Sequence, residues 1–417
     1  MSAPSAAEPL AATEVPDEVL LARAYLSRVA EPGSVPVSEF VNRFGPVEAA
    51  ERIRADDVPE LVRSATAARR TICDPQADLL VAEKRGIGLV VPESTRWPHF
   101  ALSALYVAAE RRLAGWAAGQ RTARYGGEPT VPLALWARGP YPVAELGVRS
   151  VAIVGARAAT AYGDHLAAEF GHDLAARGMA VVSGGAFGID AAAHRGALSA
   201  DGITVLVAAN GLDTAYPKAH ERLFERIAET GLVVSESPPG SLPHRHRFLS
   251  RNRLVAAFAA GTVVIEAAAR SGALNTAGHC QLLGRPLMAV PGPVTSALSV
   301  GCHALLRHPT SPAALVTSAA DVLALVGPPD VSAPPDPSDS VGSKRSALDE
   351  LDPVARAVAD GLPARGWVSE DDLAVRSGVD VVSVLRAVPV LRLAGILDSG
   401  PDGHRLRTSS RSRDSGD

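Results

Sequence analysis

Four arginines stand close together in the stretch 244-HRHRFLSRNRLVAAFAAG-261. They are Arg245, Arg247, Arg251 and Arg253. No acidic residue lies between Glu236 and Glu266. Such a cluster is most often a solvated surface, but guanidinium groups also bind phosphate oxygens. The pattern predicts that Arg251, Asn252 and Arg253 begin a helix, where cations oppose the helix macrodipole. A bound anion would explain them better than helix stability does.

Two small-residue turns supply backbone N–H groups that could bind the same anion. In 183-SGGAFGID-190, Gly184 and Gly188 permit positive φ and a close approach of a ligand. N–H groups in such turns form anion-binding nests. In 270-RSGALNTAG-278, Ser271 and Gly272 precede a predicted helix, whose N-terminus also favours phosphate.

Two more cations follow predicted strands. Arg157 follows the first one, in 151-VAIVGARAATAYG-163, which lacks the G-x-G-x-x-G dinucleotide fingerprint. Lys218 follows a proline suited to the first turn of a helix. Each could be an ordinary surface residue, but the carboxyl ends of parallel strands meet at one edge of a sheet. We therefore expect an anion or nucleic-acid groove there, formed by Arg157, Gly184, Gly188, Lys218, Arg251, Asn252, Arg253, Arg270, Ser271 and Gly272.

No set of residues specifies a reaction. The serines are not in a G-x-S-x-G elbow, and no P-loop sequence occurs. Asp190 and His194 share a predicted helix face, but no third metal ligand has the required spacing. Glu236 and Glu266 could form a carboxylate pair without defining any chemistry. We predict no catalytic residue, no metal and no cofactor, hence a binding protein rather than an enzyme.

The groove residues need a sheet to position them. Short Val/Ile-rich runs with little polar alternation are typical of parallel strands buried on both faces. They alternate with helical segments, which predicts an α/β, Rossmann-like, doubly wound, mostly parallel sheet over residues 124–326. The runs are 149-RSVAIVGA, 179-MAVVSGG, 203-ITVLVAA, 231-GLVVSES, 262-TVVIEAA and 286-PLMAVPG.

Other segments flank this core. Apolar residues recur at helical spacing over 16–123, which predicts a helical domain of the SAM or HhH type. A linker rich in Pro, Ser and Asp occupies 327–343, and a small winged-helix-like domain is expected over 344–408. Its arginines are scattered, so it could contact protein rather than duplex DNA. Residues 1–15 and 409–417 are expected to be disordered.

The composition excludes some classes of protein. The 417 residues carry a formal net charge of -4, which rules out a uniformly basic nucleic-acid binder but not a local basic groove. Three dispersed cysteines fit a reducing compartment. Neither a signal peptide nor a membrane-spanning run is evident. We expect a cytoplasmic protein with no membrane partner.

Taken together, these segments resemble the DNA-processing protein A family, also called DprA or Smf, over about residues 130–310. Six motifs match in order and spacing: VAIVGARAATAYG, SGGAFGIDAAAHRGAL, GLDTAYPKAHERLFERI, VVSESPPGSLPHRHRFLSRNRLVAAFA, VVIEAAARSGALNTA and GRPLMAVPGPV. The resemblance implies a homodimer that binds and protects single-stranded DNA and loads RecA recombinase onto it during natural transformation. It also implies that the ten groove residues contact DNA.

The sequence departs from the family pattern in places. His220 stands where the family usually has Asn, and Arg270 replaces a lysine. Leu249-Ser250 and Ala273-Leu274-Asn275 also differ. The alternative is a nucleotide-processing enzyme of the related phosphoribohydrolase class, but 183-SGGAFGIDAAAH lacks the glutamate of its P-G-G-x-G-T-x-x-E motif. A DNA-binding housekeeping role without DNA uptake fits the sequence equally well.

Overall fold

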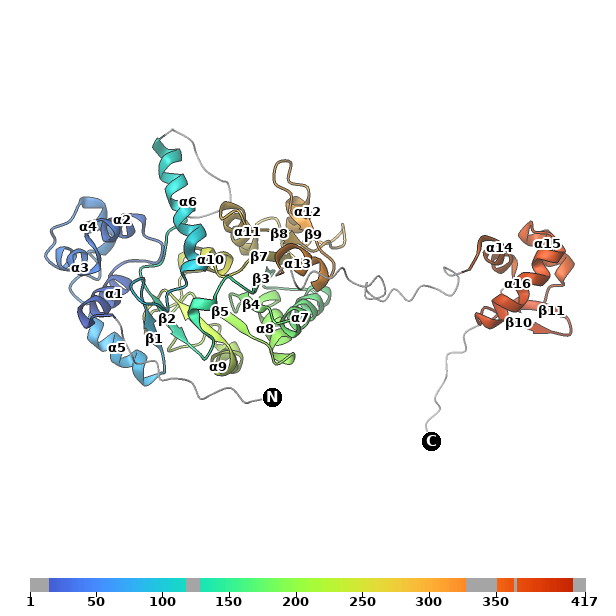
Figure 1. The fold of residues 1–417 in the computed structure, drawn as a ribbon, viewed down its shortest axis with the longest axis horizontal. Helices are drawn as coiled ribbons and strands as arrows, with labels where there is room; N and C mark the ends of the chain where they lie inside the picture. The colour runs from blue at the N-terminus through green and yellow to red at the C-terminus, as the bar shows by residue number, and fades with distance from the viewer. Residues whose placement is uncertain (1–14, 118–127, 328–350, 364–365, 408–417) are drawn as a thin grey trace. The chain divides into compact units, whose positions relative to one another are not determined.

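The structure, a computed structural model, describes residues 15–117, 128–327, 351–363 and 366–407. The chain divides into two compact units, residues 1–334 and 335–417 (Figure 1). Both predicted disordered ends, apart from Val15, lie outside the described residues, as does the predicted linker after Gly327. Among the helices of the described ranges, none is long and apolar enough to span a membrane.

The described part of the chain begins with five short helices, of which the first four share an apolar core. Tyr25, Leu26, Val37 and Ile53 are buried in it. Three of the helices start with a proline in the first turn, where the missing N–H costs nothing. The helices are α1 (Asp17–Val29), α2 (Val35–Phe44), α3 (Pro46–Arg54), α4 (Glu60–Thr66) and α5 (Pro75–Lys84).

A single sheet forms the centre of the first unit. Its order is β1-β2-β6-β5-β4-β3-β7-β8-β9. The run from β6 to β9 is parallel, whereas β1 and β2 are antiparallel to their neighbours. The strands are β1 (Gly88–Val90), β2 (Leu135–Arg138), β3 (Ser150–Gly155), β4 (Ala180–Ser183), β5 (Thr204–Val207), β6 (Leu232–Ser235), β7 (Gly261–Ile265), β8 (Leu287–Ala289) and β9 (Ala314–Leu315).

All six predicted strands are present, and the predicted mostly parallel α/β fold is confirmed. The predicted helical N-terminal region is confirmed, but it also contains the short strand β1, which joins the edge of the sheet through β2. Its three residues are too few to show a strand periodicity. The long helix α6 (His99–Ala117) also packs on the α/β core, because Leu102 and Leu105 are buried against it.

Helices cover both faces of the sheet (Figure 1). One face is covered by α6, α10 and α11, and the other by α7, α8, α9 and α13. The helices that follow the strands are α7 (Ala161–Ala176), α8 (Ile189–Ser199), α9 (Glu221–Thr230), α10 (Arg245–Ala257), α11 (Gly272–Leu282), α12 (Val300–Leu306) and α13 (Ala319–Val326). Two 3-10 turns, η1 (Val143–Glu145) and η2 (Lys218–His220), complete the unit.

Helix α10 begins earlier than predicted. His244 is its N-cap, so Arg251, Asn252 and Arg253 lie in its middle and not at its start. Only Arg245 therefore lies at the helix N-terminus, where a cation opposes the macrodipole. Arg251, Asn252 and Arg253 lie too far along the helix for this effect. The first turns of α10 are polar and show no apolar periodicity, so the sequence pattern did not predict them as helix.

The described residues of the second unit form three helices followed by a β-hairpin. Val358, Leu373, Val384, Leu391 and Leu397 are buried in its small core. The elements are α14 (Pro353–Gly361), α15 (Glu370–Ser377), α16 (Val381–Leu393), β10 (Leu397–Gly400) and β11 (Gly403–Leu406). The winged-helix assignment remains a prediction.

Candidate nucleic-acid interface

A cleft of about 730 Å³ opens at the carboxyl ends of the parallel strands. Strand β3 pairs with β4 on one side and with β7 on the other, so the direction of strand order reverses at β3. Ligands of open α/β sheets bind at such a switch point. The walls come from the turns after β3, β4 and β7 and from the outer surface of α10.

Arginines dominate the charge of this cleft. Arg157, Arg245 and Arg270 are exposed at its walls, and Arg251 is buried beside them. Of the described residues that line the cleft, only Asp190 is acidic, and burial raises the pKa of its carboxyl. A cleft lined by one sign of charge concentrates ligands of the opposite sign. The site is therefore suited to an anion.

Arg251 and Asn252 connect the structural elements that form the cleft. The guanidinium Nη1 of Arg251 donates to the Gly184 carbonyl (2.7 Å) and to that of Val207, and burial lowers the pKa of Arg251 to about 10. It stays charged at neutral pH. The amide of Asn252 donates to Asn275 Oδ1 (3.1 Å) at the start of α11. These two residues cross-link α10 to the turns on either side, so both position the cleft as well as lining it.

The predicted glycine positions have packing reasons. A Cβ at Gly184 would come within 2.4 Å of Arg251 Nη2. Gly188 has φ +73°, and a Cβ there would lie 2.3 Å from the Ala156 carbonyl oxygen. Gly188 is not among the lining residues of the cleft. It instead allows the start of α8 to pack under the turn that carries Arg157.

Besides Gly188, two predicted DNA contacts, Arg253 and Lys218, do not line the cleft. Arg253 is 1% exposed and forms a two-pronged ion pair with Glu236, with both N···O distances 2.6 Å. Its guanidinium also donates to the Thr130 carbonyl (2.8 Å). Glu236 already satisfies the charge of Arg253 inside the protein, and Arg253 does not line the cleft, so its contact with DNA stays a prediction. Lys218 is exposed, but it lines a separate hollow beside α9.

Arg245, Phe248 and Tyr216 also line the cleft, although none of them was among the predicted site residues. Arg245 was part of the arginine cluster but was not assigned to the groove. Phe248 and Tyr216 form an aromatic wall, with ring centroids 5.4 Å apart. The Arg157 guanidinium lies 5.3 Å from the Phe248 centroid, which is cation–π distance. These two rings give the cleft aromatic faces although the chain as a whole is poor in aromatic residues.

His220, the departure from the family pattern, is buried under the glycine turn. Its Nδ1 lies 3.1 Å from the Gly185 carbonyl oxygen, and its ring contacts Phe187 edge-on at 4.6 Å. His220 therefore packs against the glycine turn on the side away from solvent. The change from Asn leaves the exposed arginines of the cleft untouched.

The candidate catalytic groups are kept apart. Glu236 is paired with Arg253, whereas Glu266 accepts hydrogen bonds from the backbone N–H (2.9 Å) and the hydroxyl of Thr160 at the start of α7. The two carboxylates therefore do not form a pair. Within the described ranges, no three His, Cys, Asp or Glu side chains are grouped in a way that could hold a metal.

Helix α8 contains a buried neutral histidine, His194, which packs against β5. Thr204 Oγ1 donates to the Val181 carbonyl (2.8 Å), so it must accept the Nδ1–H of His194 (2.7 Å). The other nitrogen, Nε2, is buried with no hydrogen-bond partner in the described part of the chain. Protonating Nε2 would bury an unpaired charge, and this burial lowers the pKa of His194 from 6.5 to about 3.

We expect His194 to make stability depend on pH. Between about pH 6.5 and pH 3 the unfolded chain binds a proton at this residue that the folded chain does not, so stability falls as the pH falls. The contribution reaches about 1.4 kcal/mol per pH unit. Urea unfolding at pH 7, 6 and 5 should show a shallower pH dependence for His194→Gln than for wild type. Equal dependence in both proteins would contradict the buried neutral state.

The chain has relatives among known DNA-processing proteins. A model of the family "DNA recombination-mediator protein A" matches residues 122–327. The DNA processing protein DprA of Mycobacterium tuberculosis is 46% identical over 382 residues, which cover 92% of this chain and 93% of that protein. Protein Smf of Escherichia coli is 35% identical over 244 residues, covering 57% of this chain and 62% of that protein.

Among solved structures, DNA processing protein A of Streptococcus pneumoniae has a similar fold. The TM-score is 0.56 at 28% sequence identity, and the match covers 74% of this chain and 98% of that one. The similarity therefore extends beyond the α/β core, which alone makes up about half of the chain.

Proposed function

Because this chain belongs to the DprA/Smf family of DNA recombination mediators, we propose that it binds and protects single-stranded DNA in the cleft at the ends of β3 and β7. The observation that carries the proposal is the set of exposed arginines, Arg157, Arg245 and Arg270, around an aromatic wall. The family consists of mediators and not of enzymes, which also speaks against the phosphoribohydrolase alternative.

The aromatic wall favours a single strand over a duplex. Unpaired bases stack on aromatic side chains, and each stacked base is worth about 1–3 kcal/mol. Phe248 and Tyr216 offer such faces next to Arg157, so a base and its phosphate could be bound together. In a duplex the base faces are already stacked on one another. Recognition of this kind depends little on sequence.

The path of the strand can extend beyond the cleft. Tyr216 lines the cleft, and Lys218, two residues further on, is exposed at the neighbouring hollow. A strand that leaves the cleft past Tyr216 would reach the Lys218 ammonium group. Lys218 thus keeps its predicted role in the proposal as a flanking phosphate contact.

Binding should weaken steeply with salt. Four phosphate contacts, from Arg157, Arg245, Arg270 and Lys218, give a slope of log K against log salt of roughly -3 for a single strand. Fluorescence anisotropy of a labelled oligothymidine, titrated from low to high salt, measures it. A blunt duplex of the same length is the control and should bind more weakly. A slope near zero, or a preference for the duplex, is incompatible with the proposal.

Membership of the family also suggests a location, an oligomeric state and a protein partner. We propose that the protein acts in the cytoplasm as a homodimer and loads RecA recombinase onto the DNA that it holds, in natural transformation or in general recombination. The test is RecA filament formation on DNA covered by single-strand-binding protein, with and without this protein.

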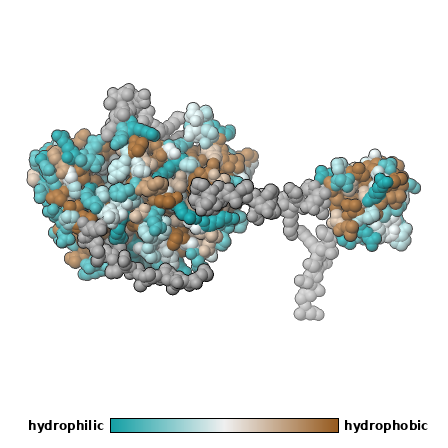
Figure 2. All heavy atoms as spheres, viewed as in Figure 1, coloured by the Kyte–Doolittle hydropathy of each residue, from teal (hydrophilic) through white to brown (hydrophobic). Residues whose placement is uncertain are grey.

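The second unit fits a protein contact better than a DNA contact. Apolar side chains are exposed on its surface, among them Val375, Leu385 and Leu393, which is 91% exposed (Figure 2). Leu385 and Leu393 both lie on α16, the helix before the hairpin. A helix that entered a DNA groove would instead expose polar and basic residues.

A further inference from the structure

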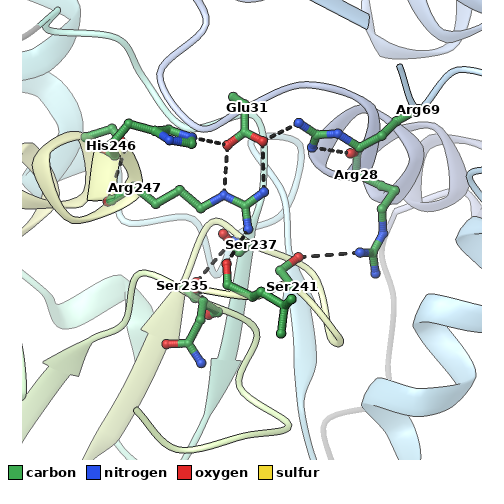
Figure 3. A network of polar contacts seen from close by, with 11 residues as sticks. Arg28, Glu31, Arg69, Ser235, Ser237, Ser241, His246 and Arg247 are labelled. Atoms are coloured by element: carbon green, nitrogen blue, oxygen red, sulfur yellow. Dashed lines mark hydrogen bonds and ion pairs between the residues drawn. The ribbon is translucent and has the colours of Figure 1, made fainter. Parts of the chain in front are cut away.

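Two residues at the C-terminal end of α1 contact the segment that leads into α10. They are Arg28, in the last turn, and Glu31, two residues after the helix. Glu31 accepts two hydrogen bonds of 2.8 Å from the Arg247 guanidinium and lies 2.8 Å from His246 Nε2 (Figure 3). Arg69 also contacts its carboxylate. Burial alone would raise the pKa of Glu31, but the hydrogen bonds from Arg247 and His246 outweigh it and keep the pKa well below its usual value.

A second contact from α1 lies beside the first. Arg28 donates to the Ser241 hydroxyl (3.4 Å; Figure 3) and to the Pro239 carbonyl, and its guanidinium also forms an ion pair with Asp78. Arg247 in turn donates to the Leu242 carbonyl (2.7 Å). The segment 239–247 is thus attached to the N-terminal helices at both of its ends.

This segment and the next turn of α10 supply one wall of the cleft. Pro243, Arg245, Phe248 and Leu249 all line it. Arg245 lies two residues, and Phe248 one residue, from Arg247, so a shift of Arg247 would move both a phosphate-binding cation and the stacking ring. The attachment is nearly buried, since the Arg247 side chain is 9% exposed.

We propose that Glu31 is a positioning residue for DNA binding: through Arg247 it holds the α10 wall of the cleft in its binding geometry. The inference rests on the proposed function. The N-terminal helices then take part in DNA affinity without touching DNA. Residues in such networks typically change a remote affinity by about 0.5–2 kcal/mol, which is about twofold to thirtyfold.

The chain contains a matched control for Glu31. Glu93 forms an ion pair of 2.6 Å with Arg23 of α1. The side-chain exposures are 9% for Arg23 and 33% for Glu93, against 9% for Arg247 and 32% for Glu31. Arg23 lies in α1 and Glu31 two residues after it, so both pairs attach this region to the rest of the unit, but neither Arg23 nor Glu93 lines the cleft. A purely structural role predicts that neither glutamate changes DNA affinity in the folded protein, whatever each contributes to Tm.

The experiment compares Glu31→Gln with Glu93→Gln in the full-length protein. Oligothymidine affinity and Tm are measured for both variants, for wild type and for Arg157→Glu. We expect similar losses of Tm in the two glutamine variants. Only Glu31→Gln should weaken DNA binding, about fivefold or more, and Arg247→Gln together with Glu31→Gln should add little further loss.

The outcomes separate the inference from the proposed function. If wild type binds DNA, Arg157→Glu does not, and the two glutamine variants bind equally well, Glu31 has no positioning role and the proposed function stands. Independent, additive losses from Glu31→Gln and Arg247→Gln would also overturn the inference. If wild type binds no oligonucleotide, the proposed function itself is wrong and the inference is lost with it.

Discussion

Replacing Arg157 and Arg270 together with glutamate is expected to weaken oligothymidine binding at least about a hundredfold, since each cation becomes a like charge facing phosphate, at a cost of several kcal/mol. Both side chains are exposed on the walls of the cleft, on the turns after β3 and β7. Their replacement should leave the free energy of unfolding within about 0.5 kcal/mol of wild type. The salt slope of the remaining binding should also fall, by about 0.7 for each lost contact.

The control has the same change of charge at other places. Arg195 on α8 and Arg222 on α9 are exposed arginines outside the cleft. Arg195→Glu with Arg222→Glu alters the net charge equally, so a global electrostatic effect would weaken binding in both double variants. Anisotropy at two salt concentrations distinguishes them. Equal weakening in the two variants would mean that the cleft is not the binding site.

Replacing Arg251 with glutamate tests DNA binding in the cleft less cleanly than its position in the sequence suggests. Its position in the cluster made it the obvious residue to replace with glutamate. Its guanidinium, however, donates to the Gly184 and Val207 carbonyls inside the protein. A carboxylate there would face two carbonyl oxygens in a buried site. Loss of binding in such a variant would report misfolding as readily as a lost DNA contact.

The sequence predicted the parts of the site that depend on local pattern. Parallel strands buried on both faces appear as continuous apolar runs, and all six runs became strands. The position of the cleft could also be predicted, because Arg157 and Arg270 lie in the turns that follow two of these strands. The edge strand β1 and the first turns of α10 lack such a pattern and were missed.

The partners of the arginines could not be predicted in the same way. Arg247 pairs with Glu31, which is 216 residues away in the sequence, and Arg253 pairs with Glu236 across a strand end. Such pairs depend on which segments the tertiary fold brings together. The cluster appeared uncompensated because its carboxylates lie outside the stretch. Only Arg245 of the four remains an exposed cation of the cleft.

Breaking the Arg253–Glu236 pair is expected to have the largest effect on stability. Arg253→Ala would leave the Glu236 carboxylate buried at 8% exposure without its counter-charge. Removing one partner of a buried pair costs about 3–5 kcal/mol, because the remaining charge has lost its water and its partner. The Thr130 and Ser250 carbonyls would lose their donor as well. Urea unfolding at neutral pH measures the loss.

The double variant and the DNA readout decide what Arg253 does. Arg253→Met with Glu236→Leu removes both charges, so it should be markedly less destabilised than Arg253→Ala. If Arg253 is only structural, the folded double variant binds oligothymidine with the wild-type salt slope. If Arg253 contacts phosphate, as the arginine cluster first indicated, the slope falls by about 0.7 even where the fold is intact. Because stability and salt slope are independent measurements, the two roles of this arginine cannot be mistaken for each other.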